Sequence, residues 1–146
     1  MKNPSVAESI TNRRFSYLGK RTRIRTEYTV SGYKSDLYIE DTKTVVEIKS
    51  ILSFAKGHEA QFPSVVSQRA VDQLIKLKRL LDAGYKVNYI FVSLNPKIRQ
   101  LAINKTIEEY RDAYNSCIEK GMMVKGVSLK LKDGKPIIYS SLPVIT

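Results

Sequence analysis

The sequence predicts an α/β protein in which helices flank a central mixed β-sheet. Three observations lead to this prediction: short segments rich in β-branched and aromatic residues, longer segments with apolar residues at helical spacing, and an order in which the two kinds alternate. The chain of 146 residues contains neither an internal repeat nor a low-complexity linker. Because this length suffices for one hydrophobic core, we expect a single domain, residues 1–146.

The first third of the chain predicts one helix and three strands. The segment SVAESITN (5–12) suits a short helix, with Ser5 at its N-cap. The strand-like segments RTRIRTEYTV (21–30), SDLYIE (35–40) and KTVVEIKS (43–50) follow, separated by SGYK and DT. Strands joined by such short turns pair antiparallel, so we expect three consecutive antiparallel strands.

The middle of the chain predicts a loop, a helix and a buried strand. Residues 55–64 read as a loop, and residues 65–84 then repeat apolar side chains at helical spacing. Pro63 and Ser64 are suitable residues for the start of this helix. The largely apolar segment 86–94 predicts a strand that is buried in the sheet.

The end of the chain predicts a second long helix and two strands. The helix is expected at residues 104–121, with Asn104 as its N-cap. Residues 123–131 and 135–144 are strand-like and flank an Asp-Gly turn. The alternation of helices and strands therefore continues to the last residues.

The basic composition favours a polyanionic partner. The chain carries 25 Lys and Arg against 14 Asp and Glu, a net charge of +11. Such a charge attracts nucleic acid or an anionic membrane. Nucleic acid is the better expectation, because the basic residues are spread over strands and helices and do not form one amphipathic basic helix.

Some kinds of site are excluded by composition. Cys117 is the single cysteine and His58 the single histidine, so an internal disulfide and a His/Cys zinc site are ruled out. Any metal would be held by oxygen atoms. Because no apolar run is long enough for a membrane span or a signal peptide, we expect a cytoplasmic protein.

Two acids and a lysine share one face of the second predicted hairpin. If this hairpin turns at residues 41–42, Asp36 lies directly opposite Glu47, and Lys49 follows on the same face. Two carboxylates with Cβ atoms ~5 Å apart repel by about 3 kcal/mol at an effective dielectric constant of 20. Protonation of one acid, a bridge from Lys49 or a bound divalent cation would relieve the repulsion. Alternatively, this is the solvated outer face of an edge hairpin, with Lys49 in a cross-strand ion pair.

The first predicted hairpin extends this face. A turn at Gly32 and Tyr33, with glycine in the first position of a type II′ turn, would place Thr29 opposite Asp36. Since side chains alternate along a strand, Glu27 would then lie on the same face as Asp36. The sequence thus predicts a third carboxylate beside the first two.

The order of these residues resembles a nuclease core. Asp36, followed on the next strand by Glu47-Ile48-Lys49, is similar to the PD-(D/E)xK motif. From Asn3 to the C-terminus, the chain also resembles the second domain of the sugar fermentation stimulation protein family, whose members are viewed as DNA or RNA nucleases. The stretches that carry the resemblance are SDLYIED, VVEIKS, FPSVVSQRA and SLPV. The resemblance implies a restriction-endonuclease-like core.

The sequence departs from the family pattern in three places. The family usually has an N-terminal domain resembling an OB fold that helps to hold nucleic acid, and no stretch here corresponds to it. Where members often carry a basic residue and Phe around the first acid, this chain has Lys34-Ser35 and Leu37. Where an Asp and a Gly are usual in the later stretch, it has Ser64 and Ala70.

The resemblance implies roles for the acids and the lysine. Asp36 and Glu47 would bind Mg²⁺ or Mn²⁺, with the carbonyl of Ile48 as a third ligand. Lys49 would orient the attacking water or stabilise the negative charge that develops on the scissile phosphate. Glu27 would be an accessory metal ligand.

Residues outside this hairpin complete the predicted site. Glu8, on the expected first helix, matches a helix acid of many nucleases in the superfamily and would orient a metal-bound water. Gln68 and Arg69 follow the core strands and would reach the same site, with Arg69 clamping a phosphate. The other predicted nucleic-acid-binding residues are basic and would track the backbone without reading sequence: Arg13, Arg14, Arg21, Arg23, Arg25 and Lys34.

The sequence therefore predicts a Mg²⁺- or Mn²⁺-dependent nuclease that hydrolyses DNA, with RNA as the other substrate. A Holliday-junction resolvase is an alternative within this class, and it requires a homodimer. A non-catalytic nucleic-acid-binding regulator, with structural acids, is the alternative from a different class. A separate OB-like protein is a further expected partner.

Overall fold

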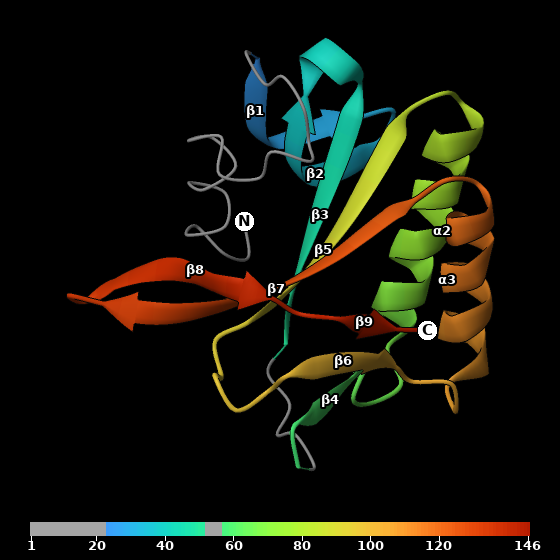
Figure 1. Ribbon diagram of the computed structural model, residues 1–146. Helices are drawn as coiled ribbons and strands as arrows, with labels where there is room; N and C mark the ends of the chain where they lie inside the picture. The colour runs from blue at the N-terminus through green and yellow to red at the C-terminus, as the bar shows by residue number, and fades with distance from the viewer. Residues whose placement is uncertain (1–22, 52–56) are drawn as a thin grey trace.

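The computed structural model describes residues 23–51 and 57–146. Its main element is a six-stranded sheet in the order β1-β2-β3-β5-β7-β8, shown in Figure 1. The central strands pair in parallel, β3 with β5 and β5 with β7, and the outer pairs are antiparallel. The strands are β1 (Ile24–Val30), β2 (Tyr33–Ile39), β3 (Thr44–Ile51), β5 (Lys86–Ser93), β7 (Met123–Lys132) and β8 (Lys135–Ser141). The predicted α/β class with a central mixed sheet is confirmed.

A small second sheet lies beside the main one and was not predicted. Its parallel strands, in the order β4-β6-β9, are β4 (Glu59–Phe62), β6 (Gln100–Ile103) and β9 (Val144–Ile145). The expectation of a loop at residues 55–64 is therefore wrong for the β4 residues. Strands of two to four residues are too short to show an alternating pattern, so only their pairing identifies them.

Two helices, α2 (Gln68–Asp82) and α3 (Glu108–Glu119), match the two long helices predicted from periodicity. Their starts differ from the prediction. The N-cap of α2 is Ser67, whose hydroxyl accepts a hydrogen bond from the N–H of Ala70 at 3.2 Å. Asn104 does not cap α3, because its side chain is engaged by Thr106 and by the carbonyl of Pro63.

Both helices pack on the same face of the main sheet (Figure 1). In β5, Tyr89 and Phe91 face the helices, whereas Ile90 and Val92 join a second apolar cluster on the opposite face. In β3, Val45 faces the helices, and Val46 faces away. Since side chains alternate along a strand, Glu47 and Lys49 must share the helix face with Val45. Burial on both faces of the central strands thus directs two charged side chains toward α2.

Two further expectations concern the helix at the start of the chain and a membrane span. The short helix expected at residues 5–12 lies outside the described residues. Among the helices at 23–51 and 57–146, none combines the length and the apolar character that crossing a membrane requires.

Candidate active site

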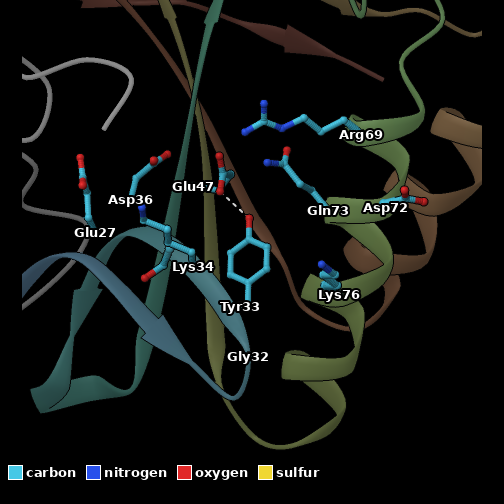
Figure 2. A pocket seen from close by; sticks show the side chains of 11 residues that line it. Glu27, Gly32, Tyr33, Lys34, Asp36, Glu47, Arg69, Asp72, Gln73 and Lys76 are labelled. Atoms are coloured by element: carbon cyan, nitrogen blue, oxygen red, sulfur yellow. Dashed lines mark hydrogen bonds between the residues drawn. The ribbon is translucent and has the colours of Figure 1, made fainter.

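An open pocket of about 670 Å³ lies between the tip of the β1–β2 hairpin, β3 and α2. Figure 2 shows side chains from the hairpin and β3 facing side chains from α2 across this pocket. Its walls carry both acids and cations. The lining residues are Glu27, Gly32, Tyr33, Lys34, Ser35, Asp36, Glu47, Arg69, Asp72, Gln73 and Lys76.

The turn of the first hairpin lies one residue earlier than predicted. Its central residues are Ser31 and Gly32, both with positive φ (46° and 82°), as a type I′ turn requires. Thr29 consequently faces Lys34, and the prediction that it faces Asp36 is wrong. The type I′ turn matches the right-handed twist of the strands, and the sequence offered no signal for a positive φ at serine.

The corrected register brings a third acid directly opposite the first. Backbone pairing of β1 with β2 includes Thr26 with Leu37 and Tyr28 with Ser35, which leaves Glu27 facing Asp36 between them. Glu27 has φ 47°, in the left-handed region that costs a non-glycine residue about 1–3 kcal/mol. Both acids line the pocket, so this interruption of the strand lies at the candidate site.

The predicted register of the second hairpin is confirmed where it is paired. Leu37 faces Val46, and the same register extended by one residue places Asp36 beside Glu47. At Asp36 the ladder ends, and its carboxylate Oδ2 accepts a hydrogen bond of 2.7 Å from the N–H of Ile48. A side chain thus replaces the backbone acceptor of the strand, and this contact fixes the position of the Asp36 carboxylate.

The acids and the lysine are buried, so the interpretation as a solvated outer face is wrong. The exposed fractions are 8% for Asp36, 1% for Glu47 and 6% for Lys49. The Nζ of Lys49 lies 3.5 Å from Oε2 of Glu47, which is on the same strand, so this ion pair is not the cross-strand pair of that interpretation. The hydroxyl of Tyr33 donates a hydrogen bond to Glu47 Oε1 (Figure 2). Burial, reinforced by Glu47, raises the pKa of Tyr33, so this phenol remains a donor at neutral pH.

Helix α2 supplies the opposite wall. Arg69, Asp72, Gln73 and Lys76 follow one another at helical spacing and all line the pocket. Gln73 accepts a hydrogen bond from the ammonium group of Lys49. Lys49 is therefore held between a carboxylate on its own strand and an amide on the helix.

A second pocket of about 460 Å³ adjoins the first at the N-terminal end of α2. Arg69 and Gln73 line both pockets, and Lys49 lines the second. Ser67 and Phe62 contribute to its wall. The lysine, the arginine and the glutamine thus lie where the two pockets meet.

The predicted nucleic-acid-binding residues are placed unevenly. Lys34 and Arg69 line the first pocket, whereas neither pocket includes Gln68, whose side chain donates to Asp72 at 3.0 Å. Arg25 is exposed and paired with Glu40 at 2.7 Å, away from both pockets. Arg23 is also exposed, and its backbone N–H donates to Asp41. Four predicted residues lie outside the described part of the chain: Glu8, Arg13, Arg14 and Arg21.

Several residues that line the pocket were not predicted from the sequence, and two of them, Tyr33 and Gln73, contact Glu47 and Lys49 directly. Gln73 had a signal, because it follows Arg69 by four residues and so shares its helix face. Tyr33 had none, because its contact with Glu47 depends on how the hairpin tip lies over β3.

The donor set suits a hard divalent cation. Within residues 23–51 and 57–146, no three His, Cys, Asp or Glu side chains are grouped as metal ligands. Asp36 and Glu47 are two carboxylates on adjacent strands facing an open pocket. Mg²⁺ typically takes one or two carboxylates and keeps several waters, so two acids with the backbone carbonyl of Ile48 match its preference.

The histidine and the cysteine do not belong to the site. His58 is exposed, and its Nδ1 lies 3.0 Å from the carbonyl oxygen of Lys97. Cys117 is buried in the core, where its thiol donates to the carbonyl of Leu74. Burial raises the pKa of the Cys117 thiol to about 11, so it is not a nucleophile at neutral pH.

Comparisons with known proteins give one consistent result. The family model described as "Sugar fermentation stimulation protein RE domain" matches residues 1–135. The sugar fermentation stimulation protein homolog of Rhizobium rhizogenes is 26% identical over 136 residues, covering 90% of this chain and 55% of that protein. The homolog of Caldivirga maquilingensis is 29% identical over 112 residues, covering 74% of this chain and 48% of that protein. The chain thus spans about half the length of the curated relatives it matches.

A solved structure shares the fold. The Pyrococcus furiosus SfsA structure in complex with Ca²⁺ superimposes with a TM-score of 0.80 and 20% sequence identity. The match covers 95% of this chain and 62% of that one. The topology described above is therefore shared over nearly the whole of this chain.

Proposed function

This chain belongs to the sugar fermentation stimulation protein family, and from that premise we propose that it is a divalent-metal-dependent nuclease that hydrolyses phosphodiester bonds of DNA. The observation that carries the proposal is the burial of Asp36, Glu47 and Lys49 where two open pockets meet. Burying charged groups costs several kcal/mol per ion before pairing, and such groups cluster at functional sites. The set therefore points to a ligand that complements it.

Asp36 and Glu47 would hold the cation, with the carbonyl of Ile48 as a third ligand and Glu27 as an accessory one. The hydrogen bond from Ile48 keeps the Asp36 carboxylate beside β3, and Tyr33 orients that of Glu47. The solved relative is described in complex with Ca²⁺, which supports a divalent cation in this family. Mg²⁺ or Mn²⁺, when bound, would lower the pKa of a water and neutralise phosphate charge.

Lys49 would act on the phosphate. Its ammonium group is held by Glu47 and Gln73, so it needs little reorganisation to meet a developing negative charge. An ammonium group is a compact point charge whose N–H donors suit a phosphate oxygen.

Arg69 would bind the substrate beside the reacting phosphate. It lines both pockets, so its guanidinium can reach a phosphate in either. Lys34 and Lys76 add positive charge to the rim of the first pocket. These cations offset the acids, which alone would repel a polyanion.

The test is cleavage of labelled single-stranded DNA, duplex DNA, a four-way junction and RNA in Mg²⁺, Mn²⁺ or EDTA. Wild type should cleave in the metals and not in EDTA. Asp36→Asn and Lys49→Ala should abolish cleavage while DNA binding and folding persist. Asp112→Asn and Lys105→Ala, exposed changes of the same kind on or beside α3, should leave cleavage intact.

Two results would overturn the proposal. One is full metal-dependent cleavage by Asp36→Asn, because that carboxylate would then hold no essential ion. The other is DNA binding by the wild type without cleavage of any substrate in either metal, which would favour a non-catalytic binding protein.

A further inference from the structure

The β7–β8 hairpin extends beyond the main sheet as a two-stranded ribbon (Figure 1). Strand β7 pairs with β5 only as far as Ser128, and the register of β7 with β8 shifts directly after it, between Ser128 and Leu129. From Leu129 to Lys132, none of the other described strands pairs with the ribbon. At about 3.3 Å per residue, this part is roughly 13 Å long.

One face of the ribbon is basic. Lys132 pairs with Lys135, and Lys130 pairs with Ile137, so alternation places the three lysines on one face. The Nζ of Lys130 lies 4.5 Å from the ring centroid of Tyr139. The single acid of the ribbon, Asp133, is in the turn with φ 52° and not on this face.

The arrangement has an intrinsic cost. Lys132 and Lys135 are directly opposed, and like charges in that position destabilise a strand pair. All three lysines are exposed, and within the described residues none of them has an acidic partner. A polyanion placed against this face would remove the repulsion and release the counterions of the polyanion.

We infer that this ribbon binds the major groove of duplex DNA, with its lysines contacting the flanking phosphates. The major groove of B-form DNA, about 12 Å wide and about 8.5 Å deep, admits a two-stranded β-ribbon. The A-form RNA duplex has a deep and narrow major groove that side chains do not read, so duplex DNA is the better match. The inference rests on the proposed function only in naming its substrate, because the ribbon lysines line neither site pocket.

The test is equilibrium binding of one sequence as duplex DNA, duplex RNA and single-stranded DNA, in Ca²⁺ or EDTA and over a range of salt. The variant carries Lys130→Gln, Lys132→Gln and Lys135→Gln together. Its control carries Lys43→Gln, Lys86→Gln and Lys105→Gln, which remove the same charge from exposed positions off the ribbon. Thermal melting verifies that both variants are folded.

The ribbon variant should bind duplex DNA about tenfold or more weakly. The slope of log K against log salt should also become less steep by about 2–3, because each phosphate that a lysine neutralises adds roughly 0.9 to the magnitude of this slope. The control should change both quantities much less, and duplex RNA should respond less than duplex DNA. Equal effects from the two variants would overturn the inference, since only net charge would matter. Unchanged binding would also overturn it, and would leave protection of an edge strand as the role of the lysines.

The two proposals fail separately. Ribbon-dependent binding of duplex DNA without any cleavage would contradict the nuclease and leave the ribbon inference standing. Metal-dependent cleavage that requires Asp36, with duplex binding independent of the ribbon, would support the nuclease and contradict the ribbon inference.

Discussion

The walls of the site and the β7–β8 ribbon both carry lysines, but they hold them in opposite ways. Lys49 is 6% exposed and is held by Glu47 and Gln73, whereas Lys132 is exposed at a ribbon tip and faces another lysine. A fixed, partly desolvated cation can stabilise charge that develops at one point. An exposed cation in water attracts a polyanion over a larger area, and salt screens that attraction. The same residue type thus suits catalysis in one region and affinity in the other.

The largest effect that separates the two regions should come from Lys49→Ala. We expect kcat to fall by about 10²–10³-fold, as for removal of one preorganised charge-stabilising donor, with little change in the Kd for DNA. Lys132→Ala should do the opposite, raising Kd and leaving kcat unchanged. Single-turnover cleavage and equilibrium binding of both variants measure this contrast. If both variants change only Kd, the two lysines do not differ in role.

The next effect concerns the partner of Lys49. Gln73→Leu removes the helix acceptor of the ammonium group, and we expect kcat to fall by about 10–100-fold, as for removal of a hydrogen bond that supports a catalytic group. Gln73→Glu keeps an acceptor and should retain more activity than the leucine variant. If both variants lose kcat equally with KM unchanged, Gln73 does not act by positioning Lys49.

The hairpin side of the site should respond in stability. Tyr33→Phe removes one hydrogen-bond donor from the buried Glu47, and we expect the free energy of unfolding to fall by about 1–3 kcal/mol. Chemical denaturation measures this change. A variant as stable as the wild type would show that the hydrogen bond is not required to bury Glu47.

Tyrosine burial also predicts how stability depends on pH. Burial raises the pKa of Tyr33 and Tyr89, and raises that of Tyr114 to about 12. Phenols in the unfolded chain ionise near pH 10, so the folded state binds more protons above that pH. The free energy of unfolding should therefore fall as pH rises from 10 toward 12, in addition to a fall from about pH 8.5 that the raised pKa of the Cys117 thiol causes. The fall should be shallower in Tyr33→Phe, and an equal slope would contradict this assignment.

The smallest effect should come from Arg25→Ala. Arg25 pairs with Glu40 at 2.7 Å, but it is exposed and lines neither pocket. Exposed ion pairs contribute little to stability, so we expect no measurable change in melting temperature or in kcat. A clear decrease in cleavage would place Arg25 on the path of the substrate and extend the site along β1.

Much of the site could be predicted from residue order. The turn at residues 41–42 set the register of β2 with β3, because a short turn between two strands leaves few pairings. That register places Asp36 beside Glu47 and puts Lys49 on the same face. The turn of the first hairpin was predicted one residue too late, because a type I′ turn with serine at positive φ has no clear sequence signal. The error hid the direct opposition of Glu27 and Asp36.

Local patterning by itself determined the α/β class, the two long helices and the acid-acid-lysine face, because hydrophobic period and turn chemistry act over a few neighbouring residues. Only the tertiary structure decided three other features. It added the second sheet of β4, β6 and β9, whose strands are too short to carry a pattern. It brought Tyr33 and Gln73 onto Glu47 and Lys49. It extended the β7–β8 ribbon beyond β5. Each depends on which distant segments pack together, and long-range packing leaves no periodic trace along the chain.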